Sequence, residues 1–116
     1  MFKTIALLKR KAGLSRAEFI DYYENHHAPL IRELQPQIRE YRRNFIELDG
    51  AYLYPGAGEL DFDVITEMWY DDRAAYDAAM AVWNDPELTQ RRVRDESNFI
   101  DLDRIRFFIV EEHRSR

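Results

Sequence analysis

The sequence predicts one α+β domain of the ferredoxin-like type, with elements in the order βαββαβ. Continuous apolar runs at residues 5–8 and 107–110 are typical of strands buried on both faces. Residues 61–70 alternate with the period of a strand, and helical patterns occupy residues 14–34 and 71–96. The resulting order is that of a split βαβ unit, in which the strands form one antiparallel sheet. A chain of 116 residues without internal repeats fits a single domain spanning residues 1–116.

The best-defined helix is expected to begin at Leu14 and to end near Leu34. Ser15 and Glu18 have the spacing of a capping box, in which each side chain binds a backbone N–H of the helix start. Pro29 lacks an N–H and presses on the preceding turn, so the helix should kink or pause near the adjacent histidines. One helical face is formed by residues at spacings of three and four: Phe19, Tyr23, His27, Leu30 and Leu34.

The other elements follow from alternation and from capping residues. We expect strands at residues 3–10, 37–49, 61–70 and 104–112. One helix should run from Asp71 or Asp72 through Trp83, and another from Asp85 to about Glu96, with Pro86 in its first turn. Residues 50–60 hold three of the four glycines and one proline, which indicates a loop or irregular hairpin arm. This glycine-rich segment lacks the lysine and following helix of a phosphate-binding loop.

Composition narrows the classes of function. The net charge of −5 argues against a nucleic-acid-binding protein, whose surface must be basic. The absence of cysteine excludes disulfides, thiolate nucleophiles and cysteine-bound metals. No apolar run approaches the length needed to cross a membrane, and no proper signal core follows the first residues. We therefore expect a cytoplasmic protein that binds neither nucleic acid nor membrane.

The pattern of the first and last strands predicts a homodimer. Two helical segments of this length can cover only one face of a four-stranded sheet. Both terminal strands are nevertheless apolar on both faces. A second sheet packing face to face across a twofold axis would cover the remaining face. We expect such a dimer, with a pocket between sheet and helices in each copy.

His27 is the strongest candidate for a catalytic residue. Imidazole titrates near neutrality, so it can take a proton from a carbon beside a carbonyl group and return it to a leaving hydroxyl. A histidine at a helix end can instead serve only to bind the last carbonyls. Its neighbour His26 is expected to be exposed or structural. Adjacent histidines do not share a helix face as zinc ligands do, so neither a metal nor a haem cofactor is expected.

Further candidates come from the second and third strands and from the first helix. Tyr23, Tyr41 and Trp69 would suit a flat aromatic ligand, because each combines apolar area with a polar atom. Alternation places Glu67 on the same strand face as Trp69, where it could bind substrate or orient the imidazole. Asp63 shares this face but is expected to pair with an arginine on a neighbouring strand, namely Arg42, Arg43, Arg104 or Arg106. Phe99 is interpreted as a core or dimer contact.

Three segments together resemble the EthD-like family. The first, KTIALLKRKAGLSRAEFIDYYENHHAPLI at residues 3–31, joins a strand, a Gly-Leu-Ser helix start and a His-Ala-Pro sequence. The others are DFDVITEMWYDD at residues 61–72 and RDESNFIDLDRIRFFIVEEH at residues 94–113. The resemblance implies a ferredoxin-like protomer that pairs as a dimeric α/β barrel. His27, directly before Ala28 and Pro29, matches the histidine of the family, whereas Tyr23 stands where relatives often have tryptophan.

The resemblance also implies classes of activity. Similar proteins include cyclases and dehydratases of aromatic polyketide intermediates and accessory proteins of ether degradation. We therefore expect a cofactor-free lyase, cyclase or isomerase that acts on a hydroxylated aromatic or polyketide-like carbonyl compound, with His27 as general acid and base. The alternatives are a dimeric carrier of a hydrophobic metabolite without catalysis and a cofactor-free quinol monooxygenase.

Overall fold

A single four-stranded antiparallel sheet forms the centre of the molecule. The computed structural model describes residues 1–116. The strand order is β2-β3-β1-β4, as in the predicted ferredoxin-like fold. The strands are β1 (Phe2–Leu8), β2 (Glu40–Phe45), β3 (Val64–Tyr70) and β4 (Arg106–Val110). They are shorter than predicted, because the β2–β3 ladder ends at the pair Phe45 and Val64, beyond which residues 46–63 leave the sheet.

The first helical segment is continuous but changes its winding at the histidines. It consists of α1 (Arg16–Tyr22), a π-helical turn (Tyr23–His27) and α2 (Ala28–Leu34). The predicted capping box is present, since Ser15 and Glu18 bind each other's backbone N–H groups. The predicted kink takes the form of the π turn, in which the Ala28 N–H bonds to the Tyr23 carbonyl five residues back. The extra residue in this turn accommodates Pro29, which cannot donate a helical hydrogen bond.

The second helical segment also agrees with its predicted caps. α3 (Arg73–Met80) is capped by Asp72 and continues into a 3-10 turn (Ala81–Asn84). Asp85 then caps α4 (Pro86–Ser97), with Pro86 in its first turn. A short 3-10 turn (Leu102–Arg104) leads into β4. None of these helices has the length and apolar character that crossing a bilayer requires.

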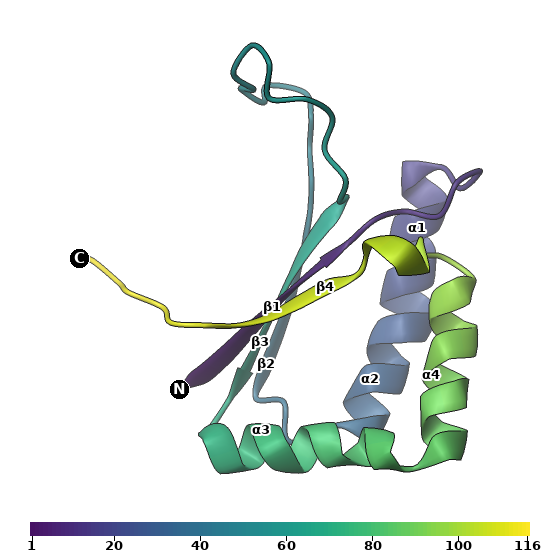
Figure 1. Ribbon diagram of the computed structural model, residues 1–116, viewed down its shortest axis with the longest axis vertical. Coiled ribbons are helices and arrows are strands. Elements are labelled where there is room, and N and C mark those ends of the chain that lie inside the picture. Colours follow the sequence, from purple (N-terminus) through teal and green to yellow (C-terminus); the bar gives the residue numbers. More distant parts are fainter.

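All helices lie on one side of the sheet (Figure 1). We call this side the covered face and the other side the open face. On the covered face, Thr4, Ala6 and Leu8 of β1 are buried together with Val64 and Thr66 of β3. The largest cluster of buried residues packs there and includes Phe19, Tyr23, Tyr41 and Phe99. The interpretation of Phe99 as a core residue is therefore confirmed.

The open face has no cover within one chain. It carries Ile5 and Leu7 of β1, Glu67 and Trp69 of β3, and Phe108 of β4, by the alternation of the paired strands. Phe108 is 46% exposed. Burial of the terminal strands on both faces, which the sequence predicted, is thus not reached in a single chain: β1 is buried on the covered face, whereas Phe107 and Ile109 of β4 stay exposed even there.

Candidate functional site

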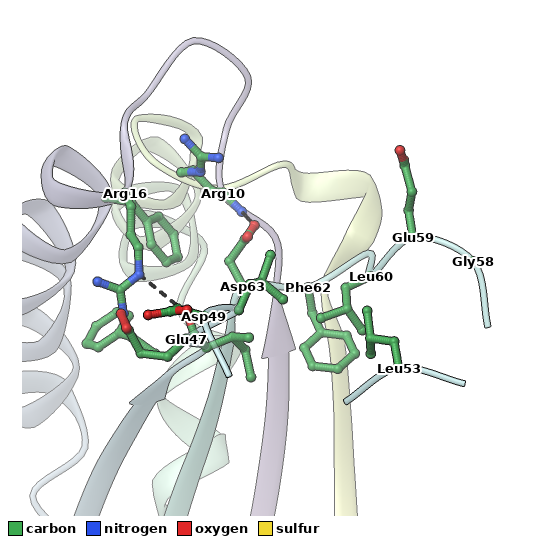
Figure 2. A pocket seen from close by; sticks show the side chains of 14 residues that line it. Arg10, Arg16, Glu47, Asp49, Leu53, Gly58, Glu59, Leu60, Phe62 and Asp63 are labelled. Atoms are coloured by element: carbon green, nitrogen blue, oxygen red, sulfur yellow. Dashed lines mark hydrogen bonds and ion pairs between the residues drawn. The ribbon is translucent and has the colours of Figure 1, made fainter. Parts of the chain in front are cut away.

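The structure contains two sizeable hollows, of which the larger lies at the end of the sheet. Its volume is about 570 Å³, and Figure 2 shows it between the start of α1 and the arm of residues 46–63. Its basic groups already have partners within the chain. Arg16 pairs with Glu47 at 2.8 Å, and the Arg10 guanidinium donates to the Leu14 carbonyl. No histidine or unpaired buried polar atom lines this hollow.

The second hollow lies between the helices and the covered face, and it contains the residue that the sequence singled out. We call it the helix-side cavity; its volume is about 290 Å³. Ten of its 14 lining residues are hydrophobic, so its walls suit a largely apolar ligand. The polar lining residues are His27, Gln35, Arg92 and Glu96.

His27 is buried and is held by a carboxylate from α4. Its Nδ1 atom lies 2.6 Å from Asp95 Oδ2. The other oxygen of Asp95 accepts a hydrogen bond from the Tyr22 hydroxyl at 3.0 Å, and Asn98 donates to that hydroxyl at 2.9 Å. Each oxygen of Asp95 therefore has one hydrogen-bonding partner, His27 on one side and Tyr22 on the other.

This arrangement determines which nitrogen of His27 is free. Because Asp95 accepts the hydrogen bond, the proton of the neutral ring lies on Nδ1. Nε2 has no hydrogen-bond partner in the chain, and part of its surface remains accessible. The lone pair of Nε2 is thus available to a molecule in the helix-side cavity. Tyr23 and His27, at the two ends of the π turn, both lie on the buried side of the helix.

The two tyrosines of the predicted site lie next to each other but are occupied by internal contacts. Tyr23 Oη lies 2.6 Å from Thr66 Oγ1 and 3.1 Å from Tyr41 Oη. Burial raises the pKa of Tyr23 to about 12 and that of Tyr41 well above its ordinary value, so both hydroxyls stay protonated. The Tyr23 ring lines the cavity, whereas Tyr41 does not.

Arg92 and Glu96 of α4 are the charged residues of the cavity wall. Arg92 Nε lies 3.4 Å from Glu96 Oε1, yet it is buried without a hydrogen-bond partner. The Arg92 guanidinium also lies over the Trp83 ring, 4.4 Å from its centroid. Burial raises the pKa of the Glu96 carboxyl, an effect that the nearby His27 and Arg92 oppose. The net effect is a pKa above the ordinary value for a glutamate.

The structure separates Glu67 and Trp69 from His27. Both side chains lie on the open face, whereas His27, Tyr23 and Tyr41 lie on the covered face. Glu67 accepts hydrogen bonds from Lys3 at 2.8 Å and from Asn44 at 3.0 Å, and Lys3 also lies over the Trp69 ring. The expectation that this strand face lines the same cavity as the histidine is therefore wrong, because alternation directs it to the opposite side of the sheet.

The predicted partner of Asp63 also needs correction. Asp63 accepts from the Arg10 backbone N–H instead of an arginine side chain. Arg43 and Arg106, two of the expected partners, pair with Glu24 and Asp61. His26 is exposed as expected, and its ring packs beside Tyr22.

Sequence reasoning missed the contribution of α4. Arg92, Asp95 and Glu96 recur at spacings of three and four residues, which places them on one side of this helix. In the sequence this segment is indistinguishable from an ordinary solvated helix, because its charges are dense and of both signs. No group of three or more histidine or acidic side chains is arranged to hold a metal ion.

Comparison with known proteins agrees with this fold. The family model of the EthD domain matches residues 11–103. None of the curated proteins matches the sequence. Among solved structures, an EthD family protein of Bacillus halodurans shares 28% identity at a TM-score of 0.66, over 97% of this chain and 100% of that one.

Two more distant structures share the fold. HapK of Hahella chejuensis aligns with a TM-score of 0.63 at 15% identity, over 100% of this chain and 96% of that one. An EthD-like protein of Ralstonia eutropha aligns with a TM-score of 0.59 at 19% identity, over 98% and 95% of the two chains.

Proposed function

Because this chain belongs to the EthD family, we propose that its helix-side cavity binds a small, largely apolar carbonyl compound and that His27 catalyses proton transfer on it. The observation that carries the proposal is the 2.6 Å contact between His27 Nδ1 and Asp95 at the wall of an apolar cavity. A carboxylate that holds one imidazole nitrogen orients the ring and stabilises the imidazolium that forms when the other nitrogen takes a proton.

The proposed reaction starts at the carbon beside the carbonyl group. His27 Nε2 takes a proton from this carbon, and the electron pair of the broken C–H bond moves to the carbonyl oxygen to give an enolate. When the carbonyl re-forms, the electrons expel a β-hydroxyl group, which takes the proton from the imidazolium and leaves as water. Return of the proton to another carbon would give an isomerisation instead. Cyclases and dehydratases of hydroxylated aromatic compounds use steps of this class.

The apolar walls would support this chemistry. An enolate formed in a cavity shielded by residues such as Met68, Trp83 and Tyr23 is protected from unwanted reprotonation by water. The cavity volume of about 290 Å³ suits a compound of one or two rings.

The proposal can be tested without the natural substrate by hydrogen–deuterium exchange of β-tetralone, a two-ring ketone with acidic protons beside its carbonyl group. In D₂O we expect the protein to accelerate the exchange of the protons on the carbons beside the carbonyl group, which NMR measures. His27→Ala should lower the protein-catalysed rate by about 10²- to 10⁴-fold. His26→Ala is the matched control, because the neighbouring ring is exposed and should leave the rate unchanged.

A carrier without catalysis remains the second candidate, because the Asp95 contact would also hold a purely structural histidine. A carrier would bind β-tetralone, measured by calorimetry, without accelerating exchange. Equal exchange rates for the wild-type protein and His27→Ala would contradict the catalytic proposal.

We also propose that two copies pair through their open faces. Exposed Phe108 and half-buried Ile5 and Leu7 form an apolar area on this face, which a second sheet would cover. Such pairing would produce the dimeric α/β barrel that the sequence predicts.

A further inference from the structure

Arg92 is a charged residue of the helix-side cavity that the proposed proton transfer does not use. Arginine stays charged in proteins, and a buried guanidinium normally has its N–H groups bound to acceptors. Here Nε is buried and lacks a hydrogen-bond partner. The remaining contacts of the guanidinium are the ion pair of Nε with Glu96 Oε1 at 3.4 Å, which is too long for a good hydrogen bond, and the Trp83 ring, which holds its plane in place without using an N–H group.

The tyrosines do not offer a free donor to a ligand. The hydroxyls of Tyr23 and Tyr41 are bound to each other, and Tyr23 is also bound to Thr66. The Gln35 amide donates to the Ala79 carbonyl at 3.0 Å. Among the polar residues that line the cavity, Arg92 is therefore the one with a buried N–H that forms no hydrogen bond, although this N–H lies within ion-pair distance of Glu96.

We propose that Arg92 receives the carbonyl oxygen of the ligand and stabilises the negative charge that develops there as an enolate. The inference rests on the proposed function, since it names the group that faces His27 during proton transfer. An N–H donor in a water-poor cavity stabilises an oxyanion much more strongly than the neutral ketone, which is the condition for accelerating the reaction. The substrate class is thereby narrowed to compounds whose enolisable carbonyl oxygen is accessible at one end of an apolar body.

Glu96 determines whether the charge of Arg92 is available. An ionised Glu96 would neutralise the guanidinium, whereas a protonated Glu96 leaves it free to bind an anion. Partial burial raises the pKa of the Glu96 carboxyl and favours its protonated form, while the ion pair with Arg92 at 3.4 Å and the nearby His27 act in the opposite direction.

The test uses para-nitrophenol, whose phenolate resembles an enolate and absorbs in the visible range. At neutral pH we expect the wild-type protein to bind the phenolate about ten- to hundredfold more tightly than the neutral phenol, seen as a lowered apparent pKa of the bound probe. Arg92→Gln should abolish this preference, and Arg92→Lys should retain part of it. Arg91→Gln is the matched control, because Arg91 is exposed and pairs with Glu33.

Each outcome bears on a different statement. Binding of the neutral phenol alone by the wild-type protein would contradict the role of Arg92, while exchange of β-tetralone could still establish the catalytic role of His27. An unchanged preference for the phenolate in Arg92→Gln would also contradict the role of Arg92. If neither form binds, the cavity is not a ligand site, and both proposals fail. Glu96→Gln should change phenolate binding by less than about threefold; a tenfold gain would mean that Glu96 is an anion that occupies Arg92.

Discussion

The two faces of the sheet differ in how their polar groups are satisfied. On the covered face, Tyr23, Tyr41 and Thr66 form a buried network, and His27 is bound to Asp95. On the open face, Lys3 and Glu67 form an ion pair beside exposed apolar side chains such as Phe108. On the covered face, buried hydrogen bonds hold side chains in place and can orient a catalytic group. The open face instead presents exposed apolar side chains that a partner could cover.

The largest difference between the faces should appear in stability. Phe19 is 1% exposed and packs against Tyr23, Phe45 and Phe99. Phe19→Ala should lower the free energy of unfolding by about 3–5 kcal/mol, because it removes buried area and leaves a cavity. Phe108→Ala on the open face should change the unfolding of dilute protein by less than about 1 kcal/mol. Urea denaturation measures both; equal losses would contradict the distinction between the faces.

The proposed role of the open face can be tested by measuring dimerisation. Phe108→Asp places a charge in the proposed sheet–sheet interface and should weaken dimerisation at least hundredfold, about 3 kcal/mol. Sedimentation analysis at several protein concentrations measures this change. The control is Leu102→Asp, because Leu102 is also exposed but lies in the 3-10 turn before β4 and outside the sheet. A wild-type protein that stays monomeric at micromolar concentration would contradict the proposed dimer.

Two threonines on the covered face test the value of the buried network. Thr66→Val should cost about 1–3 kcal/mol of unfolding free energy, because it removes a partner of the buried Tyr23 hydroxyl. Thr4 is equally buried on the neighbouring strand, but its hydroxyl has no hydrogen-bond partner. Thr4→Val should therefore be neutral or slightly stabilising. Thermal unfolding compares the pair, and an equal loss in both variants would show that the network adds nothing.

The smallest expected effect is the dependence of stability on acid. Hydrogen bonds from Arg43 lower the pKa of Glu24 on the covered side, and the hydrogen bond from Lys3 lowers that of Glu67 on the open face. A carboxyl whose pKa is lower in the folded state stabilises the protein above its ordinary pKa and loses this contribution as the pH falls through the folded value. Stability should thus decline from about pH 5 to about pH 3.

Glu24→Gln and Glu67→Gln should each flatten this decline by less than about 1 kcal/mol, because both ion pairs are partly exposed. Urea denaturation across this pH range measures the change. If the open faces pair, the effect of Glu67→Gln should grow with protein concentration, while that of Glu24→Gln should not. An unchanged acid dependence in both variants would show that other carboxyl groups cause the decline.

Local signals in the sequence predicted the elements well where the relevant chemistry is local. The Ser15–Glu18 capping box and the Asp85-Pro86 helix start were confirmed, because caps depend on residues within one turn. Pro29 predicted a disturbance at the histidines, but the form of a π turn depends on the packing of the helix against the sheet. The end of β2 was placed too late and the start of β3 too early, because alternation continues beyond the last paired residues, Phe45 and Val64.

The candidate site was harder to predict than the elements, because local patterns do not show which distant segments pack together. His27 could be selected from the sequence because a histidine interrupts an apolar helix face. Glu67 and Trp69 were assigned to the same cavity because alternation reveals which residues share a strand face but not which face a helix covers. Asp95, Arg92 and Glu96 were missed because their helix resembles any charged surface helix until it is packed against the histidine.

The sequence by itself determined the order of the elements, the ferredoxin-like class, the helix starts and the candidate His27, since each depends on periodicity or on neighbouring residues. Only the tertiary structure decided that Asp95 holds His27 across 68 positions and that Arg92 and Glu96 line the same cavity as His27. These features arise from the docking of α4 beside the first helix, and contacts between segments so distant in the chain leave no local signal.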